Sequence, residues 1–391
     1  AITATIDVSG GAGNGAGVAG NGGAIQLKTA KPTAAAATIT QTVPILGTGT
    51  VGGLLKVVAP DDVTLQNAAN DMGTLAASVT VTGKFFKYID ANNIEVGTVP
   101  TLGSLTAPSS TSASQPSLSG ITTVGGTTGL ILVSTVNGSI TVTQNIEVQT
   151  SSATISLDAN RAAPEPGGAT ADIDINATVR SVSGTVDVFA DNSVRFNATG
   201  AIRSTSGNVT VRGDADGNGT GAVTMTFGSV INAGSGKISI RADDDVTLAM
   251  VRSSNATISP DAIVVTSDSE SIRDDGTETS FVQAPNITLN AAKAIGSDSL
   301  SSEITFTQAN PPTAFFFTNL SEALDIDLGS GTLTITQSGA GGNIQLREIN
   351  GQLTTSTIRL PSTGAVGDDR QIALIAAGGE ILDSEQGNAP T

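Results

Sequence analysis

The sequence predicts an all-β protein, a parallel β-helix solenoid in which each rung contributes three short strands. Three observations support this prediction. Apolar residues recur at every second position, as in "ISIRADDDVTL" from Ile238 to Leu248, whereas an amphipathic helix would repeat every 3.6 residues. The pattern apolar-x-apolar-x-Ala-x-x-x-apolar returns at Val186, Ile238 and Ile287. With the looser copies at Val209 and Ile263 included, the copies recur about every 25 residues, which is typical of a solenoid.

Composition limits the classes of function. The chain has 391 residues, 18 Lys and Arg against 35 Asp and Glu, and a net charge of −17. Such an acidic surface repels phosphate backbones and anionic lipid head groups, so we do not expect nucleic-acid binding. No apolar run approaches the length of a membrane helix, so we do not expect membrane insertion. The chain contains no Cys and no His, which excludes disulfides and thiolate metal sites and removes the commonest general base. No signal peptide opens the sequence, so we expect a mature chain or an excerpt of a longer one.

Residues 1–130 are predicted to form a less regular portion of the solenoid. A Gly-rich loop leads into a strand at residues 24–29. The segment "FFKYIDANNIEV" (85–96) predicts two strands around an Asn turn. The Ser/Thr/Pro-rich stretch 101–120 predicts either an extruded loop or a linker between segments.

Residues 131–391 are predicted to form the regular repeats. Five strands start at Val186, Val209, Ile238, Ile263 and Ile287, so the steps are 23, 29, 25 and 24 residues. The longest step contains the insert "GDADGNGTG" (213–221). At ~25 residues per rung, the whole chain would form roughly 16 rungs.

One rung can be divided into strands at residues 186–190, 194–198 and 201–203, with a turn between successive strands. Each strand would pair with its counterpart in the next rung and point its apolar residues into a narrow core. The corner "DDD" (Asp243, Asp244 and Asp245) is interpreted as a solvated turn with outward charges. The predicted inward residues are Val186, Val188, Ile238, Ile240, Ile287, Leu289, Ile372 and Leu374.

The segments "NITLNAAKAIGSDS", "DAIVVTSDSESIRDDG" and "QIALIAAGGEILDSEQGN" resemble repeats of the filamentous-haemagglutinin-like exoproteins, which are very large bacterial surface proteins. The similarity covers residues 130–391 and only weakly the first third. The resemblance implies a right-handed β-helix shaft outside the cell that serves adhesion or surface display. The family's N-terminal secretion domain has no counterpart in this sequence, so the export route is left open.

The insert also contains a candidate calcium loop. Asp214, Asp216, Asn218 and Thr220 fall at alternate positions, which is how loops of the EF-hand type begin. The twelfth position should supply a bidentate Glu but is Met225, so a complete EF-hand is excluded. Calcium is the only candidate cofactor, and an ordinary Asp/Gly/Asn surface loop is the alternative.

Three consecutive aromatic residues, Phe315, Phe316 and Phe317, form a candidate partner contact. Successive side chains of a strand face opposite sides, so at least one ring would point away from the core. Either a neighbouring loop covers that ring, or it forms a lateral contact with another chain or segment.

The function most consistent with the composition, the repeats and the resemblance is a structural or adhesive shaft of a secreted or cell-surface bacterial protein. Its expected partners are further segments or copies of the same protein, end to end or side by side, and a host or surface receptor. A self-polymerising extracellular filament subunit is the first alternative. A β-helix enzyme that degrades polysaccharides is the second, but no carboxylate pair stands out and aromatic residues form only 3% of the chain.

Overall fold

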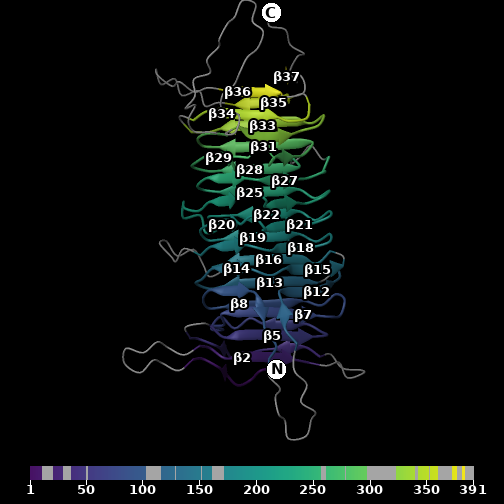
Figure 1. The fold of residues 1–391 in the computed structure, drawn as a ribbon, viewed down its shortest axis with the longest axis vertical. Helices are drawn as coiled ribbons and strands as arrows, with labels where there is room; N and C mark the ends of the chain where they lie inside the picture. The colour runs from purple at the N-terminus through teal and green to yellow at the C-terminus, as the bar shows by residue number, and fades with distance from the viewer. Residues whose placement is uncertain are drawn as a thin grey trace, which may run out of the picture.

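The computed structural model describes residues 1–10, 21–29, 37–49, 52–102, 116–127, 129–150, 152–160, 171–256, 261–277, 279–296, 323–339, 342–351, 353–359, 372–376 and 381–383. Within these ranges the regular elements are all β-strands, which confirms the predicted all-β class. The strands stack along one long axis (Figure 1). No helix within the described residues is long and apolar enough to cross a membrane.

The first face of the stack is a single file of parallel strands. Its thirteen members are β3 (Ile39–Thr40), β6 (Val63–Leu65), β8 (Phe86–Asp90), β13 (Leu130–Thr135), β16 (Thr154–Ala159), β19 (Val186–Ala190), β22 (Val209–Arg212), β25 (Ile238–Ala242), β28 (Ile263–Ser267), β31 (Asn286–Ala291), β33 (Thr332–Gln337), β35 (Leu353–Arg359) and β37 (Ile381–Asp383). Thirteen strands have twelve intervals, which span roughly 58 Å at ~4.8 Å each. The first face therefore has fewer described strands than the roughly sixteen rungs predicted from chain length. The segments between strands take up more of the chain than that prediction allowed.

The middle of the stack has two further faces. The second face holds β9 (Ile94–Val96), β14 (Ile140–Val142), β17 (Ile173–Ile175), β20 (Val194–Phe196), β23 (Val223–Met225), β26 (Val246–Leu248) and β29 (Ile272–Asp274). The third face holds β12 (Ile121–Gly125), β15 (Ile146–Thr150), β18 (Thr178–Arg180), β21 (Ala201–Arg203), β24 (Val230–Asn232), β27 (Met250–Arg252) and β30 (Val282–Gln283). These rungs confirm the prediction of three strands each.

The second and third faces merge toward both ends of the stack. Near the N-terminus β2 (Ala24–Lys28), β5 (Leu54–Ala59) and β7 (Thr74–Val79) form one file, and β7 pairs with both β9 and β12. Toward the C-terminus the corresponding file is β32 (Leu324–Asp327), β34 (Ile344–Glu348) and β36 (Ile372–Ala376). Rungs at the ends are therefore two-faced, which the sequence analysis did not predict.

Two short pairs lie outside these files. β1 (Ile6–Asp7) pairs in parallel with β4 (Ile45–Leu46), next to the N-terminal rungs. β10 (Thr98–Val99) pairs with β11 (Leu118–Ser119) in an antiparallel arrangement. Most of the Ser/Thr/Pro-rich stretch between β10 and β11 lies outside the described residues.

The predicted strand register is confirmed. Val186, Val209, Ile238, Ile263 and Ile287 are successive Cα partners down the first face. The two strands expected in residues 85–96 are β8 and β9. The second strand of the analysed rung ends at Phe196 rather than at residue 198, and the strand expected at residues 24–29 ends at Lys28.

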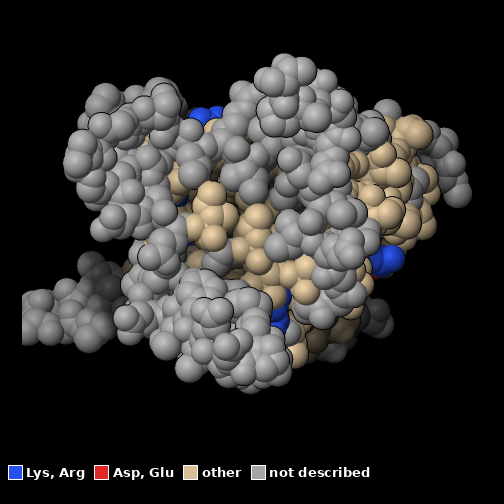
Figure 2. Space-filling model, turned by 90° about the horizontal axis from the view of Figure 1, so that it is seen from above, with Lys and Arg blue, Asp and Glu red and all other residues tan. Residues whose placement is uncertain are grey.

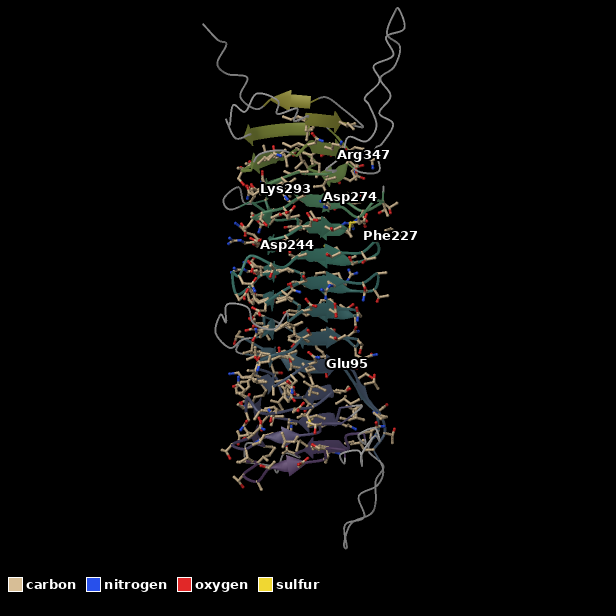
Figure 3. All side chains as sticks on the ribbon, turned by 90° about the vertical axis from the view of Figure 1, so that its left-hand side faces the viewer. Glu95, Phe227, Asp244, Asp274, Lys293 and Arg347 are labelled. Atoms are coloured by element: carbon tan, nitrogen blue, oxygen red, sulfur yellow. The ribbon has the colours of Figure 1, made fainter. Side chains whose placement is uncertain are left out.

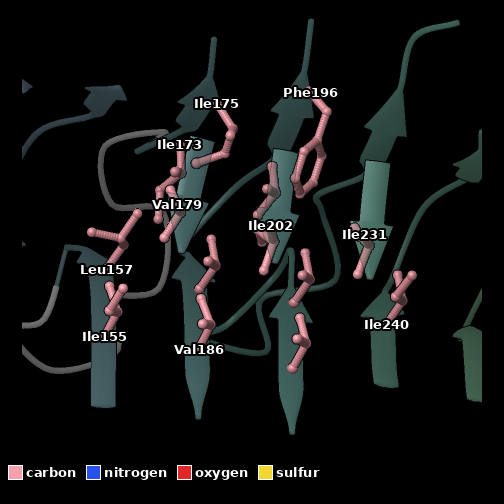
Figure 4. Packing of buried hydrophobic residues seen from close by; sticks show 14 of the residues in the cluster. Ile155, Leu157, Ile173, Ile175, Val179, Val186, Phe196, Ile202, Ile231 and Ile240 are labelled. Carbon is pink, nitrogen blue, oxygen red and sulfur yellow. The ribbon is translucent and has the colours of Figure 1, made fainter. Parts of the chain in front are cut away.

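One hydrophobic cluster fills the stack from Ile25 to Leu353 (Figure 4). Each fully buried Val, Leu or Ile side chain contributes about 1.5–3 kcal/mol. The predicted inward residues of β19, β25 and β31 are at most 1% exposed. Strand pairing places Ile372 and Leu374 in the inward column of Ile344 and Leu346, as predicted, but Ile372 is 43% exposed and Leu374 is only partly buried. Both lie in β36, the last strand of its file within the described residues, where no further described rung covers the side chains.

Candidate functional site

The candidate calcium loop lies at a corner of the stack, between β22 and β23. The Asp214 amide donates to the Asn192 carbonyl at 2.8 Å in the preceding rung. On the opposite side, the Gly221 amide donates to Asp244 Oδ2 at 3.0 Å in the following rung. The insert is therefore fixed between Asn192 of one rung and the Asp243–Asp245 corner of the next.

The oxygen atoms of the loop already accept hydrogen bonds from the loop itself. Gly219 N donates to Asp214 Oδ1 at 3.1 Å, and Asn218 Nδ2 donates to Asp216 Oδ2 at 2.8 Å. Thr220 donates to Asn218 Oδ1 from its amide at 2.9 Å and from its hydroxyl at 2.6 Å. No group of three or more Asp, Glu, His or Cys within the described residues is arranged to hold a metal ion.

The electrostatics of this corner favour a cation or a proton. Burial raises the pKa of Asp191 above its ordinary value, and the neighbouring Asp216 adds to that rise. Burial also raises the pKa of Asp214, to which Asp216 and Asp243 contribute. The neighbouring carboxylates thus disfavour the ionised state of Asp191 and of Asp214. Calcium binding by Asp214, Asp216, Asn218 and Thr220 remains a prediction.

The Asp243–Asp245 corner forms a turn, as predicted, but its carboxylates do not simply point into solvent. All three residues are half-buried. Ser269 Oγ donates to Asp243 Oδ2 at 2.7 Å, and Ser271 N donates to Asp245 Oδ1 at 3.1 Å. Arg273 Nε lies 2.9 Å from Asp245 Oδ2. The corner is therefore bonded to its neighbouring rungs, and it lies on a different side of the stack from Phe227 (Figure 3).

A groove follows the third face on the opposite side of the core from these contacts. It consists of two hollows of about 240 and 500 Å³, and both are lined by Asn232 and Arg252. The smaller hollow lies where the chain enters the third face, at Phe227–Val230, Thr279 and Ser280. The larger lies where the chain leaves it, at Gly234, Ser253, Ser254, Ala284 and Pro285. The strands that border the hollows, β21, β24, β27 and β30, have only two or three residues each. A side chain at either end of such a strand is therefore close to one of the two hollows.

The outward residues of the third face form two columns. Strand pairing places Arg203, Asn232, Arg252 and Gln283 in one column. Ala201, Val230 and Met250 form the other, which is apolar. This groove is not apparent from the sequence, because a two-residue apolar period identifies the inward residue of each strand and leaves the outward residues unconstrained.

The remaining predicted site lies outside the described residues. Phe315, Phe316 and Phe317 fall in a segment whose placement the structure does not describe. A partner contact at these residues therefore stays a prediction.

The fold defines this chain as a protein of the parallel β-structure repeat class. No protein-family model, no curated protein and no solved structure matches the chain. The resemblance to filamentous-haemagglutinin-like repeats therefore rests on the motifs quoted above.

Proposed function

We propose that this chain is a shaft segment of a large secreted or cell-surface bacterial protein that displays binding surfaces along its length. The observation that carries the proposal is the single file of thirteen parallel strands on the first face, in which each strand pairs only with the rung before and the rung after. Such a stack gains length by adding rungs, without changing the core of existing ones. Continuous hydrogen bonding along the axis stiffens the rod, so it can hold a binding surface away from a cell.

A self-polymerising extracellular filament subunit is the runner-up. Figure 2 looks onto the C-terminal end of the stack, where uncharged residues occupy most of the described surface and a few basic side chains lie at its edge. The uncharged described residues at this end would permit two acidic rods to approach end to end, because these residues add no charge to the repulsion between the sides of the rods.

The polysaccharide-degrading alternative has one specific residue to test. Burial raises the pKa of Asp274 to about 7, and the nearby Asp275 and Asp325 add to that rise. A carboxyl group that stays protonated near neutral pH can serve as a general acid. Turnover of a polysaccharide by the purified chain, abolished in Asp274→Asn, would favour an enzyme over a shaft.

Electron microscopy of the purified chain tests the proposal directly. We expect isolated rods with a stacked portion of roughly 60 Å at ~4.8 Å per rung. End-to-end filaments would favour the filament subunit, and round particles would overturn both. For the adhesive role, beads coated with the chain should bind to a cell or glycan surface more than beads coated with the heat-denatured chain. Equal binding of the two would count against adhesion.

A further inference from the structure

Two arginine side chains of the groove have no ion-pair partner within the described part of this acidic chain. Five other arginines of that part, Arg180, Arg195, Arg241, Arg273 and Arg347, lie within 4.0 Å of a carboxylate oxygen. Arg212 on the first face has a buried Nε atom without a hydrogen-bond partner, but it stands in a different column. Arg203 and Arg252 form no such pair and donate no side-chain hydrogen bond. In a chain with 35 acidic residues, two unpaired guanidinium groups in one column indicate a binding site for an external anion.

Arg252 is held in place rather than free in solvent. Its guanidinium carbon lies 4.8 Å from the centre of the Phe281 ring, in cation–π contact. Its Nε atom is buried and has no hydrogen-bond partner. A stacked guanidinium with unused donors is preorganised to bind a carboxylate, because little conformational freedom is lost when the ligand arrives.

A second unpartnered group lines the same groove. Ser229 is fully buried, and its hydroxyl forms no hydrogen bond. It borders the smaller hollow together with Arg203 and Arg252. A buried hydroxyl without a hydrogen-bond partner is destabilising, so its presence at a hollow indicates that a ligand atom supplies the missing hydrogen bond.

The groove also has an apolar side. Phe227 is 54% exposed and, like Val230 and Met250, lines the smaller hollow. The ring projects from the flank of the rod (Figure 3). An exposed aromatic ring beside amide and hydroxyl groups suits a ligand with apolar C–H faces and many hydroxyls, which is the chemistry of a sugar.

The geometry points to a binding site for an acidic saccharide, with Arg203 and Arg252 binding carboxylates on alternate sugars and Phe227 stacking against a sugar face. The two arginines are separated by Asn232, so their Cα atoms lie two rungs or roughly 10 Å apart at ~4.8 Å per rung. A β-linked disaccharide advances by a comparable length. This inference goes beyond the proposed function, since it can hold for a rod in any role.

Two other anionic ligands fit the groove less well. A highly charged polyanion would meet the Asp327 carboxylate in the larger hollow and a net charge of −17 over the whole chain. An acidic peptide in an extended conformation repeats its side chains on one face every two residues, or ~7 Å, which does not match two rungs. A saccharide with one carboxylate per disaccharide matches both the charge and the spacing.

The test is a calorimetric titration of the full chain with a hyaluronan tetrasaccharide, which carries a carboxylate on alternate sugars. The comparison ligands are a neutral N-acetylglucosamine tetramer, a heparin tetrasaccharide and a tetraglutamate peptide. The variants are Arg203→Gln, Arg252→Gln and Phe227→Ala. Arg180→Gln is the matched control, because Arg180 lies in the same column but pairs with Glu147 at 2.5 Å. Thermal melting verifies that each variant is folded, and the exposed Arg203 and Phe227 keep the test informative if Arg252→Gln unfolds.

We expect the hyaluronan tetrasaccharide to bind and the neutral tetramer to bind at least tenfold more weakly. Each groove variant should lose at least tenfold in affinity, and Arg180→Gln should match the parent chain. Absence of hyaluronan binding would overturn the inference, as would equal binding by the parent and Arg203→Gln. Tighter binding of the heparin tetrasaccharide or of tetraglutamate would assign the groove to a polyanion or to a protein partner instead. Since none of these outcomes depends on particle shape, they are independent of the microscopy that tests the shaft.

Discussion

At the residue scale, buried polar side chains fix successive rungs to each other. Asp90 is fully buried at the end of β8 and accepts hydrogen bonds from the Tyr88 hydroxyl at 2.6 Å, the Met72 amide at 2.9 Å and the Asn92 amide at 2.9 Å. Burial raises the pKa of Asp90 to about 7, although these donors favour the ionised form. Burial likewise raises the pKa of Tyr88, so its hydroxyl keeps its proton.

The Asp90 carboxyl should make stability depend on pH. Its pKa is higher in the folded chain than in the unfolded chain, so the folded chain retains a proton that the unfolded chain releases between about pH 4 and pH 7. The stabilisation is therefore complete below about pH 4 and is lost as pH rises through about 7. In Asp90→Asn, the fall of the melting temperature over this range should be shallower than in the parent. Asp62→Asn is the control, because Asp62 is a half-buried carboxylate that forms a salt bridge with Lys84 at 3.6 Å. Parallel curves for Asp90→Asn and the parent would contradict the assignment.

The calcium loop gives a second prediction at this scale. Asp216 contributes to the raised pKa values of Asp191 and Asp214, so Asp216→Asn should relieve repulsion and leave the chain as stable as the parent or more stable in a chelator. If the loop binds calcium, the ion should raise the melting temperature of the parent but not that of Asp216→Asn. Differential scanning calorimetry with calcium and with chelator measures both effects. An identical calcium response in parent and variant would eliminate this loop as the site.

At the element scale, the corner after the third face contains the same Gly-to-Ser hydrogen bond in successive rungs. The Gly184 amide donates to Ser181 Oγ at 3.0 Å, and the Gly207 amide donates to Ser204 Oγ at 2.8 Å. The corner glycines stack so closely that a Cβ on Gly207 would lie 1.9 Å from the Gly184 carbonyl oxygen. The spacing of Ser and Gly in "SVSG" and "STSG" was a sequence signal for this corner, but alternation of apolar residues does not reveal it.

Replacing a stacked glycine should therefore destabilise the rod. Gly207→Ala should cost about 1–3 kcal/mol, because the backbone of two rungs must separate to admit a methyl group. Gly351→Ala is the control, since a Cβ there would meet its nearest atom at 3.6 Å. Urea denaturation of both variants measures the difference. Equal midpoints for Gly207→Ala and Gly351→Ala would show that the corner is not tightly packed.

The strands of the first face allow a matched comparison between a buried inward residue and an exposed outward residue. Ile240 is 1% exposed, and the adjacent Ser239 on the same strand is exposed. Ile240→Asp should cost about 3–5 kcal/mol, because the charge is buried without a partner. Ser239→Asp should change stability by only about 0.5 kcal/mol. If thermal melting ranks the two variants equally, the inward register of β25 is incorrect.

At the scale of the whole molecule, charge sets how rods interact. The net charge of −17 makes two rods repel each other along their sides. Local ion pairs such as Arg195–Asp172 at 2.6 Å and Arg241–Asp268 at 2.7 Å offset only part of the excess. Association between rods should therefore depend strongly on ionic strength.

Static light scattering tests this dependence. Raising NaCl from about 0.01 M to about 1 M shortens the screening length from ~30 Å to ~3 Å, so repulsion between rods should disappear and the second virial coefficient should fall. Lowering the pH toward 4 at low salt should act in the same direction, since carboxylates become protonated. A virial coefficient that does not respond to salt would show that charge does not keep the rods apart.

The sequence by itself determined the all-β class, the parallel stacking and the register from Val186 to Ile287. Those features follow from inward residues, which must be apolar at every second position in every rung. Only the tertiary structure decided that two faces merge toward both ends of the stack, that Ile372 is exposed, and that Arg203 and Arg252 line one groove. The physical reason is that outward residues obey no periodic constraint: their surroundings depend on which rungs adjoin them and on the loops between strands, whose lengths vary from rung to rung.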